Sequence, residues 1–277
     1  MIKKRDLHLH LISDSTGETV HQFARAALAQ FPETNITEHI WTLVRSKAHI
    51  DAIDRNLSKN PGVVLFSIVS EEVREMLEEL CKKRGIPNLS ILDSVVDLFS
   101  NVLGAKQSLL AGAQHKLDTA YFKRMAAVEY AVTHDDGLNM ESLDDADILL
   151  VGVSRTSKTP TSMYLGHRGF RVANYALVPG IPFPIEKLPK KGIFVVGLTT
   201  DPKRLMQVRK TRLQHLSSKS NTNYADIENI TNEVREARKL FNEHNWPIID
   251  VSRRSVEEIA ASIIHLHRQW LDKKTNV

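Results

Sequence analysis

The sequence predicts an α/β protein with two open parallel sheets, one in each half of the chain. Short apolar runs alternate with helical patterns from residue 7 to about 103, and again from residue 146 to the end. This order is typical of parallel strands joined by crossover helices. Residues 106–144 contain no strand pattern. We therefore expect an N-terminal α/β domain over 1–105, a helical connector over 106–144 and a second α/β domain over 145–277.

The first half of the chain contains four strand patterns, at residues 7–12, 36–44, 63–69 and 89–92. Residues 16–31 place apolar side chains at one-sided helical spacing, and residues 46–58 form a second helical pattern before Asn60-Pro61-Gly62. Residues 71–83 form a helical pattern with acidic side chains at its start and basic ones at its end, an order that suits the helix dipole, and Gly85 ends the helix. A fourth helix is expected through Val102 and Leu103.

The remaining elements follow a single long helical pattern at 117–132, which is bracketed by Gly112 and by Asp135-Asp136-Gly137. Strands are expected at residues 148–151, 170–177, 193–198 and 247–251. Helices are expected at residues 158–168, 201–216, 227–243 and 255–271. In the last of these, Ser255 and Glu258 have the spacing of a capping box.

Composition restricts the class of protein. With 277 residues, 42% of them hydrophobic, the chain can bury a real core, which excludes disorder as its main state. The formal charge of +4 is too small for a protein that coats nucleic acid, although it suits a phosphate-rich ligand. The single cysteine excludes a disulfide framework and a zinc site built on paired cysteines. No run approaches the roughly 20 apolar residues of a membrane span, and no apolar export segment follows Met1, so we expect a cytoplasmic protein.

The strongest local signal is a glycine-to-lysine segment between an apolar strand and a helix, Gly152-Val153-Ser154-Arg155-Thr156-Ser157-Lys158-Thr159. A phosphate-binding loop requires this context, because its amides and the helix N-terminus face an anion, a lysine contacts the outer phosphates and the next hydroxyl binds magnesium. The second domain would then resemble a P-loop kinase. The Walker pattern has glycine where this chain has Ser157, and glycine there turns without a Cβ clash. An ordinary strand-to-helix turn is the alternative.

Two further segments carry polar groups at strand or helix ends. Ser13-Asp14-Ser15-Thr16-Gly17-Glu18-Thr19 follows the first strand and could hold a phosphate, or could be a capping cluster with Ser15 or Thr16 as N-cap. His134-Asp135-Asp136-Gly137 follows a helix, and its adjacent carboxylates could bind magnesium or accept a hydroxyl proton. A simple Asp-Asp-Gly turn is the alternative for the second segment.

Several other features favour structural roles. Asp250 at a strand end is interpreted as a loop or cap residue, His265 and His267 do not share a helix face, and Cys81 is interpreted as a structural thiol. The basic residues of the 201–216 helix form either a solvated face or a source of arginines for a transferring phosphate: Lys203, Arg204, Arg209, Lys210 and Arg212.

Taken together, the motifs resemble the family of bacterial pyruvate, phosphate dikinase regulatory proteins, which includes regulators of phosphoenolpyruvate synthase. The matching segments lie in order along most of the chain: Ser13 to Thr19, His115-Lys116-Leu117-Asp118 with Tyr121-Phe122, His134-Asp135-Asp136-Gly137, Gly152 to Pro160, and Ala173-Asn174 before Val178-Pro179-Gly180. Each segment is weak alone, whereas the set is highly specific. With serine at position 157 instead of the glycine of the Walker pattern, the loop resembles that of the dikinase-regulator branch of the family.

The resemblance implies a bifunctional enzyme. Members use ADP to phosphorylate a threonine of the dikinase, and they reverse this with inorganic phosphate, releasing pyrophosphate. On this chain, residues Gly152 to Thr159 would hold ADP, with Lys158 on its β-phosphate and Thr159 on Mg²⁺. By position and chemistry, Asp135 or Asp136 would orient the threonine hydroxyl, and the segment from Ser13 to Gly17 would bind phosphate or the target.

Two other functions stay open from the residues alone. A small-molecule kinase would use the same phosphate loop and the basic residues of 203–212, and a nucleotide sensor would bind without catalysis. The sequence leans toward the dikinase over the synthase as target, and it leaves the oligomeric state open, a homodimer included.

Overall fold

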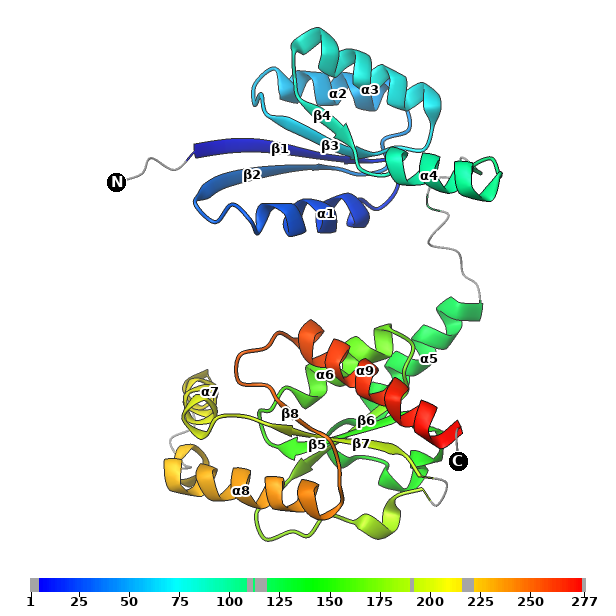
Figure 1. Cartoon of the computed structure of the whole chain (residues 1–277). Coiled ribbons are helices and arrows are strands. Elements are labelled where there is room, and N and C mark those ends of the chain that lie inside the picture. Colours follow the sequence, from blue (N-terminus) through cyan, green and yellow to red (C-terminus); the bar gives the residue numbers. More distant parts are fainter. Residues whose placement is uncertain (1–4, 109–111, 113–118, 190–191, 216–221, 276–277) are drawn as a thin grey trace. The chain divides into compact units, whose positions relative to one another are not determined.

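The computed structural model describes residues 5–108, 112, 119–189, 192–215 and 222–275. The chain divides into two compact units, residues 1–116 and 117–277 (Figure 1). Each unit contains a four-stranded parallel sheet with helices on its faces, which confirms the predicted fold class. Within the described ranges, no helix combines the length and apolar composition needed to cross a lipid bilayer.

The first unit has the strand order β2-β1-β3-β4. Its strands are β1 (Arg5–Ser13), β2 (Thr34–Trp41), β3 (Val63–Ser67) and β4 (Asn88–Ser90). Its helices are α1 (Glu18–Leu28), α2 (Lys47–Leu57), α3 (Glu71–Arg84) and α4 (Asp93–Leu103). All eight predicted elements are present. Each apolar run fills one position in the sheet, and helices α1, α2 and α3 pack on it, whereas α4 has no buried residue.

Two apolar clusters hold this unit together, one on each face of the sheet. Val20 and Ala24 of α1 pack against Leu9 and Leu11 of β1. The opposite face of the sheet is covered by α2 and α3, which lie on the other side of the strands from α1 (Figure 1). Cys81 of α3 lies fully buried in that second cluster, and burial raises the pKa of its thiol to about 11. This confirms the structural role predicted for the cysteine.

The second unit has the corresponding order β6-β5-β7-β8. Its strands are β5 (Ile148–Val153), β6 (Val172–Leu177), β7 (Phe194–Thr199) and β8 (Ile248–Asp250). Its main helices are α5 (Thr119–Thr133), α6 (Lys158–His167), α7 (Pro202–His215), α8 (Ile227–Glu243) and α9 (Val256–Thr275). Short 3₁₀ segments connect them: η2 (Asp135–Gly137), η3 (Met140–Asp145), η4 (Ile185–Lys187) and η5 (Thr222–Ala225).

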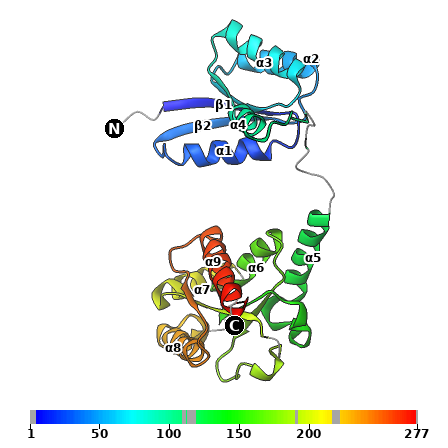
Figure 2. The ribbon, with the colours of Figure 1, turned by 45° about the vertical axis from the view of Figure 1, so that its right-hand side comes forward.

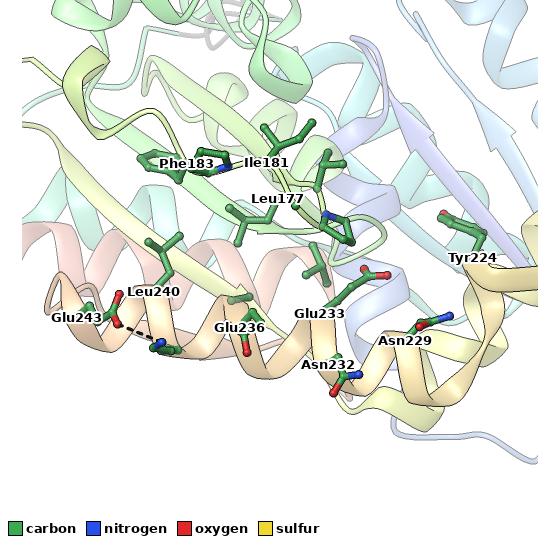
Figure 3. Close-up of a pocket in the computed structure, with 17 residues that line it drawn as sticks. Leu177, Ile181, Phe183, Tyr224, Asn229, Asn232, Glu233, Glu236, Leu240 and Glu243 are labelled. Atoms are coloured by element: carbon green, nitrogen blue, oxygen red, sulfur yellow. Dashed lines mark ion pairs between the residues drawn. The ribbon is translucent and has the colours of Figure 1, made fainter.

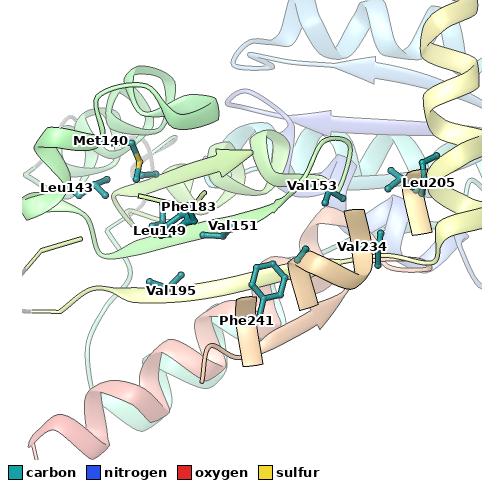
Figure 4. Close-up of a cluster of buried hydrophobic side chains, with 13 residues drawn as sticks. Met140, Leu143, Leu149, Val151, Val153, Phe183, Val195, Leu205, Val234 and Phe241 are labelled. Carbon is teal, nitrogen blue, oxygen red and sulfur yellow. The ribbon is translucent and has the colours of Figure 1, made fainter. Parts of the chain in front are cut away.

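Helices cover both faces of this second sheet. α6 and α9 lie on one side of the strands and α8 on the other (Figures 1 and 2). On the α8 side, Phe241 packs so closely on Gly197 of β7 that a Cβ there would overlap the ring, and Val151 and Val195 belong to the same cluster (Figure 4). Because β5 and β7 are buried on both faces, their sequences are continuous apolar runs rather than alternating ones.

Helix termini in this unit follow the predicted chemistry. The capping box is confirmed: Ser255 N donates to Glu258 Oε2 at 2.7 Å, and Glu258 N donates to Ser255 Oγ at 3.2 Å.

Helix α5 falls inside the expected connector of 106–144 and packs against α6 of the second unit. The expected domain limits at residues 105 and 144 stay predictions.

Both sheets have the topology that places a ligand crevice at the carboxyl ends of the central strands. In each, the first strand pairs with the second on one side and with the third on the other, so β1/β3 and β5/β7 are the points where the chain switches direction across the sheet. Ligands of open α/β sheets bind at such switch points. The two polar loops found in the sequence, 14–17 after β1 and 154–157 after β5, lie at these points.

Candidate active site in the second unit

The loop between β5 and α6 has an unusual backbone. Arg155 and Ser157 have φ angles of +71° and +59°, in the left-handed region that glycine favours. Ser157 is the N-cap of α6 with no side-chain capping bond. Within the described part of the chain, the amides of Arg155, Thr156 and Ser157 donate no hydrogen bond. The loop before α6 therefore presents unpaired amides beside the helix N-terminus, as an anion-binding site requires.

Ser157 stands where the Walker pattern has glycine, and it adopts the left-handed conformation that this position needs. The conformation costs an L-residue about 1–2 kcal/mol, so the turn is strained rather than excluded. Gly152 is constrained more tightly, because a Cβ there would lie 2.6 Å from Leu198 O and 2.7 Å from Thr156 Oγ1. The Thr156 hydroxyl itself donates to Val153 O at 2.9 Å, which folds the loop back over the strand.

Lys158 points into this loop from the first residue of α6. Its side chain is only 5% exposed, and its Nζ donates to Val153 O at 3.1 Å. Burial lowers the pKa of Lys158 to about 8, although Asp136 and Asp135 act in the opposite direction. A poorly solvated ammonium beside open amides favours a negatively charged ligand, since the ligand replaces the water that the charge has lost.

The predicted carboxylates lie beside this lysine, on the β6 side of the loop. Asp135 Oδ1 accepts a hydrogen bond from Thr159 Oγ1 at 2.8 Å and one from Asn174 Nδ2 at 2.6 Å. Asn174, fully buried in β6, also bonds Ser162 of α6 at 3.3 Å. Asp135 is thus fixed by three elements, η2, β6 and α6.

Asp136 is held differently. Its amide donates to Asn174 Oδ1 at 3.1 Å, and its φ of +53° turns the chain toward Gly137. Its carboxylate has no hydrogen bond or ion pair among the residues that the structure describes. The charge of Asp136 raises the pKa of Lys158, and its carboxylate accepts no hydrogen bond from the described residues. Asp135, in contrast, accepts hydrogen bonds from Thr159 and Asn174. The turn interpretation of this segment and the site interpretation are therefore compatible.

Arg209 explains part of the basic helix α7. It is 1% exposed, forms a two-pronged ion pair with Glu233 of α8 at 2.7 and 3.0 Å, and lies over the ring of Tyr224. It also donates to Ser154 O in the loop at 3.3 Å. The other four basic residues of the set are exposed: Lys203, Arg204, Lys210 and Arg212. Arg209 thus links the loop to α8 and is not part of a solvated face, whereas a role toward a transferring phosphate stays a prediction.

The second predicted polar loop belongs to the first unit. Asp14 Oδ2 accepts from Val69 N at 2.6 Å, and Ser13 Oγ lies 3.2 Å from Ser67 Oγ, so this loop ties the ends of β1 and β3 together. The N-cap of α1 is Gly17, with φ of +80°, rather than Ser15 or Thr16. Glu18 lies in the first helical turn, as predicted.

Unpaired amides, a buried ammonium and two carboxylates thus lie together around the loop of residues 152–159. A sequence profile described as kinase/pyrophosphorylase matches residues 9–264. The chain belongs to this kinase/pyrophosphorylase family. It is 48% identical over 263 residues to a protein of Erythrobacter litoralis, covering 95% of each chain, and 47% identical over 270 residues to one of Paramagnetospirillum magneticum, covering 98% of this chain and 87% of the other. Both relatives are provisionally named pyruvate, phosphate dikinase regulatory proteins.

Membership of the kinase/pyrophosphorylase family identifies the protein as an enzyme of the kinase and phosphorylase type. The sequence motifs indicated the loop, Lys158 and the two carboxylates, and the structure brings these together in one unit. They did not indicate the roles of Asn174, Glu233 and Tyr224. A signal for Asn174 is present, since it is a polar side chain in the apolar strand 172–177, whereas nothing in the sequence pairs Glu233 with Arg209.

Other candidate residues have structural roles. Asp250 accepts from the amide of Ser252 at 2.8 Å, as a strand-end cap does. His267 is buried against Phe194 and Trp270, apart from His265. Within the described ranges, no three His, Cys, Asp or Glu side chains group as metal ligands. The motif residues His115 to Asp118 lie outside the described residues.

Proposed function

We propose that the protein is an ADP-dependent serine/threonine protein kinase that phosphorylates a threonine of pyruvate, phosphate dikinase, and a phosphorylase that removes the phosphate with inorganic phosphate. The names of the relatives support the dikinase as target. The buried ammonium of Lys158 beside unpaired amides is the observation that carries the phosphoryl-transfer chemistry. Inactivation would follow from the kinase activity and reactivation from the phosphorylase activity.

We place the ADP phosphates on the loop from Gly152 to Thr159. The amides of residues 155–157 would bind phosphate oxygens, and Lys158 Nζ would exchange its bond to Val153 O for one to the β-phosphate. Val153 O would keep its bond from Thr156. Because the β-phosphate of ADP is the transferred group, Lys158 would neutralise charge on the reacting phosphorus itself.

The donor set fits Mg²⁺, which prefers oxygen ligands and shares them with substrate phosphates. Thr159 Oγ1 and Asp135 Oδ1 lie 2.8 Å apart and are both oxygen donors beside the loop. Thr159 would bind the ion directly and Asp135 would hold it in place. Mg²⁺ supplies charge neutralisation between the phosphates when it is bound.

Asp136 is proposed as the base of the forward reaction. Its carboxylate accepts the proton of the threonine hydroxyl, the oxygen forms a bond to the β-phosphorus, and the bond from that phosphorus to the AMP oxygen breaks. In the reverse activity an oxygen of inorganic phosphate attacks the phosphothreonine phosphorus. The bond from that phosphorus to the threonine oxygen breaks as pyrophosphate forms, and Asp136 passes the proton of inorganic phosphate to the threonine oxygen.

Two finer assignments belong to the same proposal. The loop Ser13, Asp14, Ser15, Thr16 and Gly17 would bind a phosphate at the start of α1, where Gly17 leaves the helix without a side-chain cap. We also propose that the protein acts as a homodimer and has no affinity for nucleic acid. Light scattering after size exclusion and a nucleic-acid mobility-shift assay test these two statements.

Labelled ADP tests the proposal. Purified dikinase, the protein and Mg²⁺ are incubated with ADP that carries ³²P in the β position, and the products are separated by mass. We expect label on a threonine of the dikinase and unlabelled AMP. Label on a small molecule would indicate a small-molecule kinase, and binding without transfer would indicate a sensor; either result would overturn the proposal.

Two matched variants separate the carboxylates. Asp136→Asn should lower kcat at least a hundredfold with little change in ADP affinity, because a general base typically contributes about 10²–10⁴-fold. Asp135→Asn should weaken the Mg²⁺ dependence of ADP binding instead. The reverse pattern would exchange the two roles.

A further inference from the structure

A large groove lies beside the loop and is not used by the chemistry described above. It has a volume of about 860 Å³ and runs between the segment 177–183 and helix α8 (Figure 3). Its lining includes Val153, the last residue of β5, and Tyr224. The Tyr224 hydroxyl lies 3.3 Å from Ser154 Oγ in the loop, so the groove is continuous with the candidate active site.

One wall of the groove is a preformed apolar turn. Val178, Pro179, Gly180 and Ile181 have the sequence of a type II turn, with proline second and a glycine of φ +78° third, and Ile181 N donates to Val178 O at 3.1 Å. The turn leaves Val178 and Ile181 49% and 58% exposed. Two neighbouring apolar side chains held by this turn give the groove an apolar contact surface.

The other wall is the acidic face of α8. Of the three glutamates of α8 that line the groove, Glu233 is paired with Arg209, and the Glu243 carboxylate lies 3.9 Å from Lys239 Nζ. Among the described residues, the ion-pair partner of Glu236 is its sequence neighbour Arg235, at 3.6 Å. Both side chains are about two-thirds exposed, so this ion pair contributes little stability. The pair of Glu243 with Lys239 is similarly exposed, so Glu236 and Glu243 can both accept a cation from a bound molecule. An acidic wall disfavours the phosphates of a nucleotide and favours a positively charged partner.

The groove wall is linked to the proposed base by packed rings. Phe183 in its wall packs on Tyr175 of β6 with ring centres 5.0 Å apart. The Tyr175 ring in turn lies against Gly137, next to Asp136, where a Cβ would be 3.1 Å from it. The proposed base and the groove are therefore joined through β6.

From these observations we propose that the groove binds an extended segment of the protein substrate, close to the residue that is phosphorylated. An apolar side chain of that segment packs on Val178 and Ile181, and a lysine or arginine pairs with Glu236. This assignment rests on the proposed protein-kinase function, and it adds the surface that selects the target.

Two substitutions with matched controls test it. Ile181→Asp and Glu236→Lys alter the two walls, whereas Leu271→Asp and Glu257→Lys make the same changes on α9, which covers the opposite face of the sheet. Each variant is assayed for KM toward the dikinase at saturating ADP, and for ADP affinity by titration calorimetry. We expect KM to rise at least about fivefold for the two groove variants, which is the effect of losing one strong interface contact. ADP affinity and both control variants should match the unchanged protein.

The outcomes separate this inference from the proposed function. If the unchanged protein fails to phosphorylate the dikinase, the proposed function is wrong. If it does phosphorylate the dikinase, and the groove variants have the same KM for the dikinase as the unchanged protein, the groove does not bind the target segment. If the groove variants instead lose ADP affinity at unchanged KM for the dikinase, the groove holds the nucleoside, and the inference is overturned.

Discussion

Replacing Lys158 with methionine should make the second unit more stable while abolishing nucleotide binding. Burial lowers the pKa of Lys158 from 10.5 to about 8, which corresponds to about 3 kcal/mol of unfavourable free energy for the charged form at pH 7. Methionine removes this cost and loses one hydrogen bond, worth about 1 kcal/mol. Val153 O keeps its bond from Thr156, so no acceptor is left unpaired. The net expectation is a gain of about 2 kcal/mol.

The lowered pKa of Lys158 also predicts how the stability difference between lysine and methionine changes with pH. The folded-state pKa is below the unfolded value, so between about pH 8 and 10.5 the unfolded chain binds more protons and the unchanged protein gains stability with rising pH. The advantage of Lys158→Met should therefore be full below pH 8 and be lost toward pH 10.5. Equal stabilities at pH 7, or a difference that does not depend on pH, would refute the reasoning.

The assay requires a signal from the second unit alone. Of the three tryptophans, Trp246 and Trp270 lie in that unit and Trp41 in the first. Trp41→Phe removes the third signal, and the substitution is mild because Trp41 Nε1 is buried without a hydrogen-bond partner among the described residues. Urea unfolding followed by fluorescence in this background, at pH 7 and pH 10, then compares lysine with methionine at position 158.

Three further predictions concern the same unit. Lys158→Ala should abolish both phosphorylation and phosphorolysis without unfolding the protein; survival of phosphorolysis in the assay would mean that the two activities use different centres. Arg209→Gln should lower the free energy of unfolding by about 3–5 kcal/mol, because it leaves the largely buried carboxylate of Glu233, 13% exposed, without its cation; a loss below about 1 kcal/mol in urea would contradict the link between α7 and α8. Gly152→Ala should lower the free energy of unfolding by about 1–3 kcal/mol, because the new Cβ would lie 2.6 Å from Leu198 O. An unchanged thermal unfolding temperature would show that β5 and β7 can move apart to make room for it.

The fold was predictable because burial leaves a strong pattern in the sequence. β5 and β7 are covered on both faces, so each is an unbroken apolar run, and the helices between them keep one apolar side. Element ends were less predictable: β4 occupies only Asn88–Ser90, although the apolar pattern extends to residue 92. Hydrogen bonding to β3, and not hydrophobicity, sets its length.

The candidate site was predictable where its parts are close in sequence. The strand, turn, Lys158 and Thr159 form one continuous segment, so local chemistry suffices to find them. Contacts between distant elements were not predictable, because packing alone decides them. Asn174 joins Asp135 to Ser162 across three elements, and Arg209 reaches both Glu233 and the loop. A single sequence contains the residues of such contacts but not their pairing.

The central claim is that the loop of residues 152–159 binds the β-phosphate of ADP. A crystal structure of the protein with ADP and Mg²⁺ tests it most directly. We expect Lys158 Nζ about 3 Å from a β-phosphate oxygen, the amides of residues 155–157 on the same phosphate, and the Asp136 carboxylate facing the phosphorus. A β-phosphate bound elsewhere, such as at residues 13–17 of the first unit, with Lys158 still on Val153 O, would contradict it.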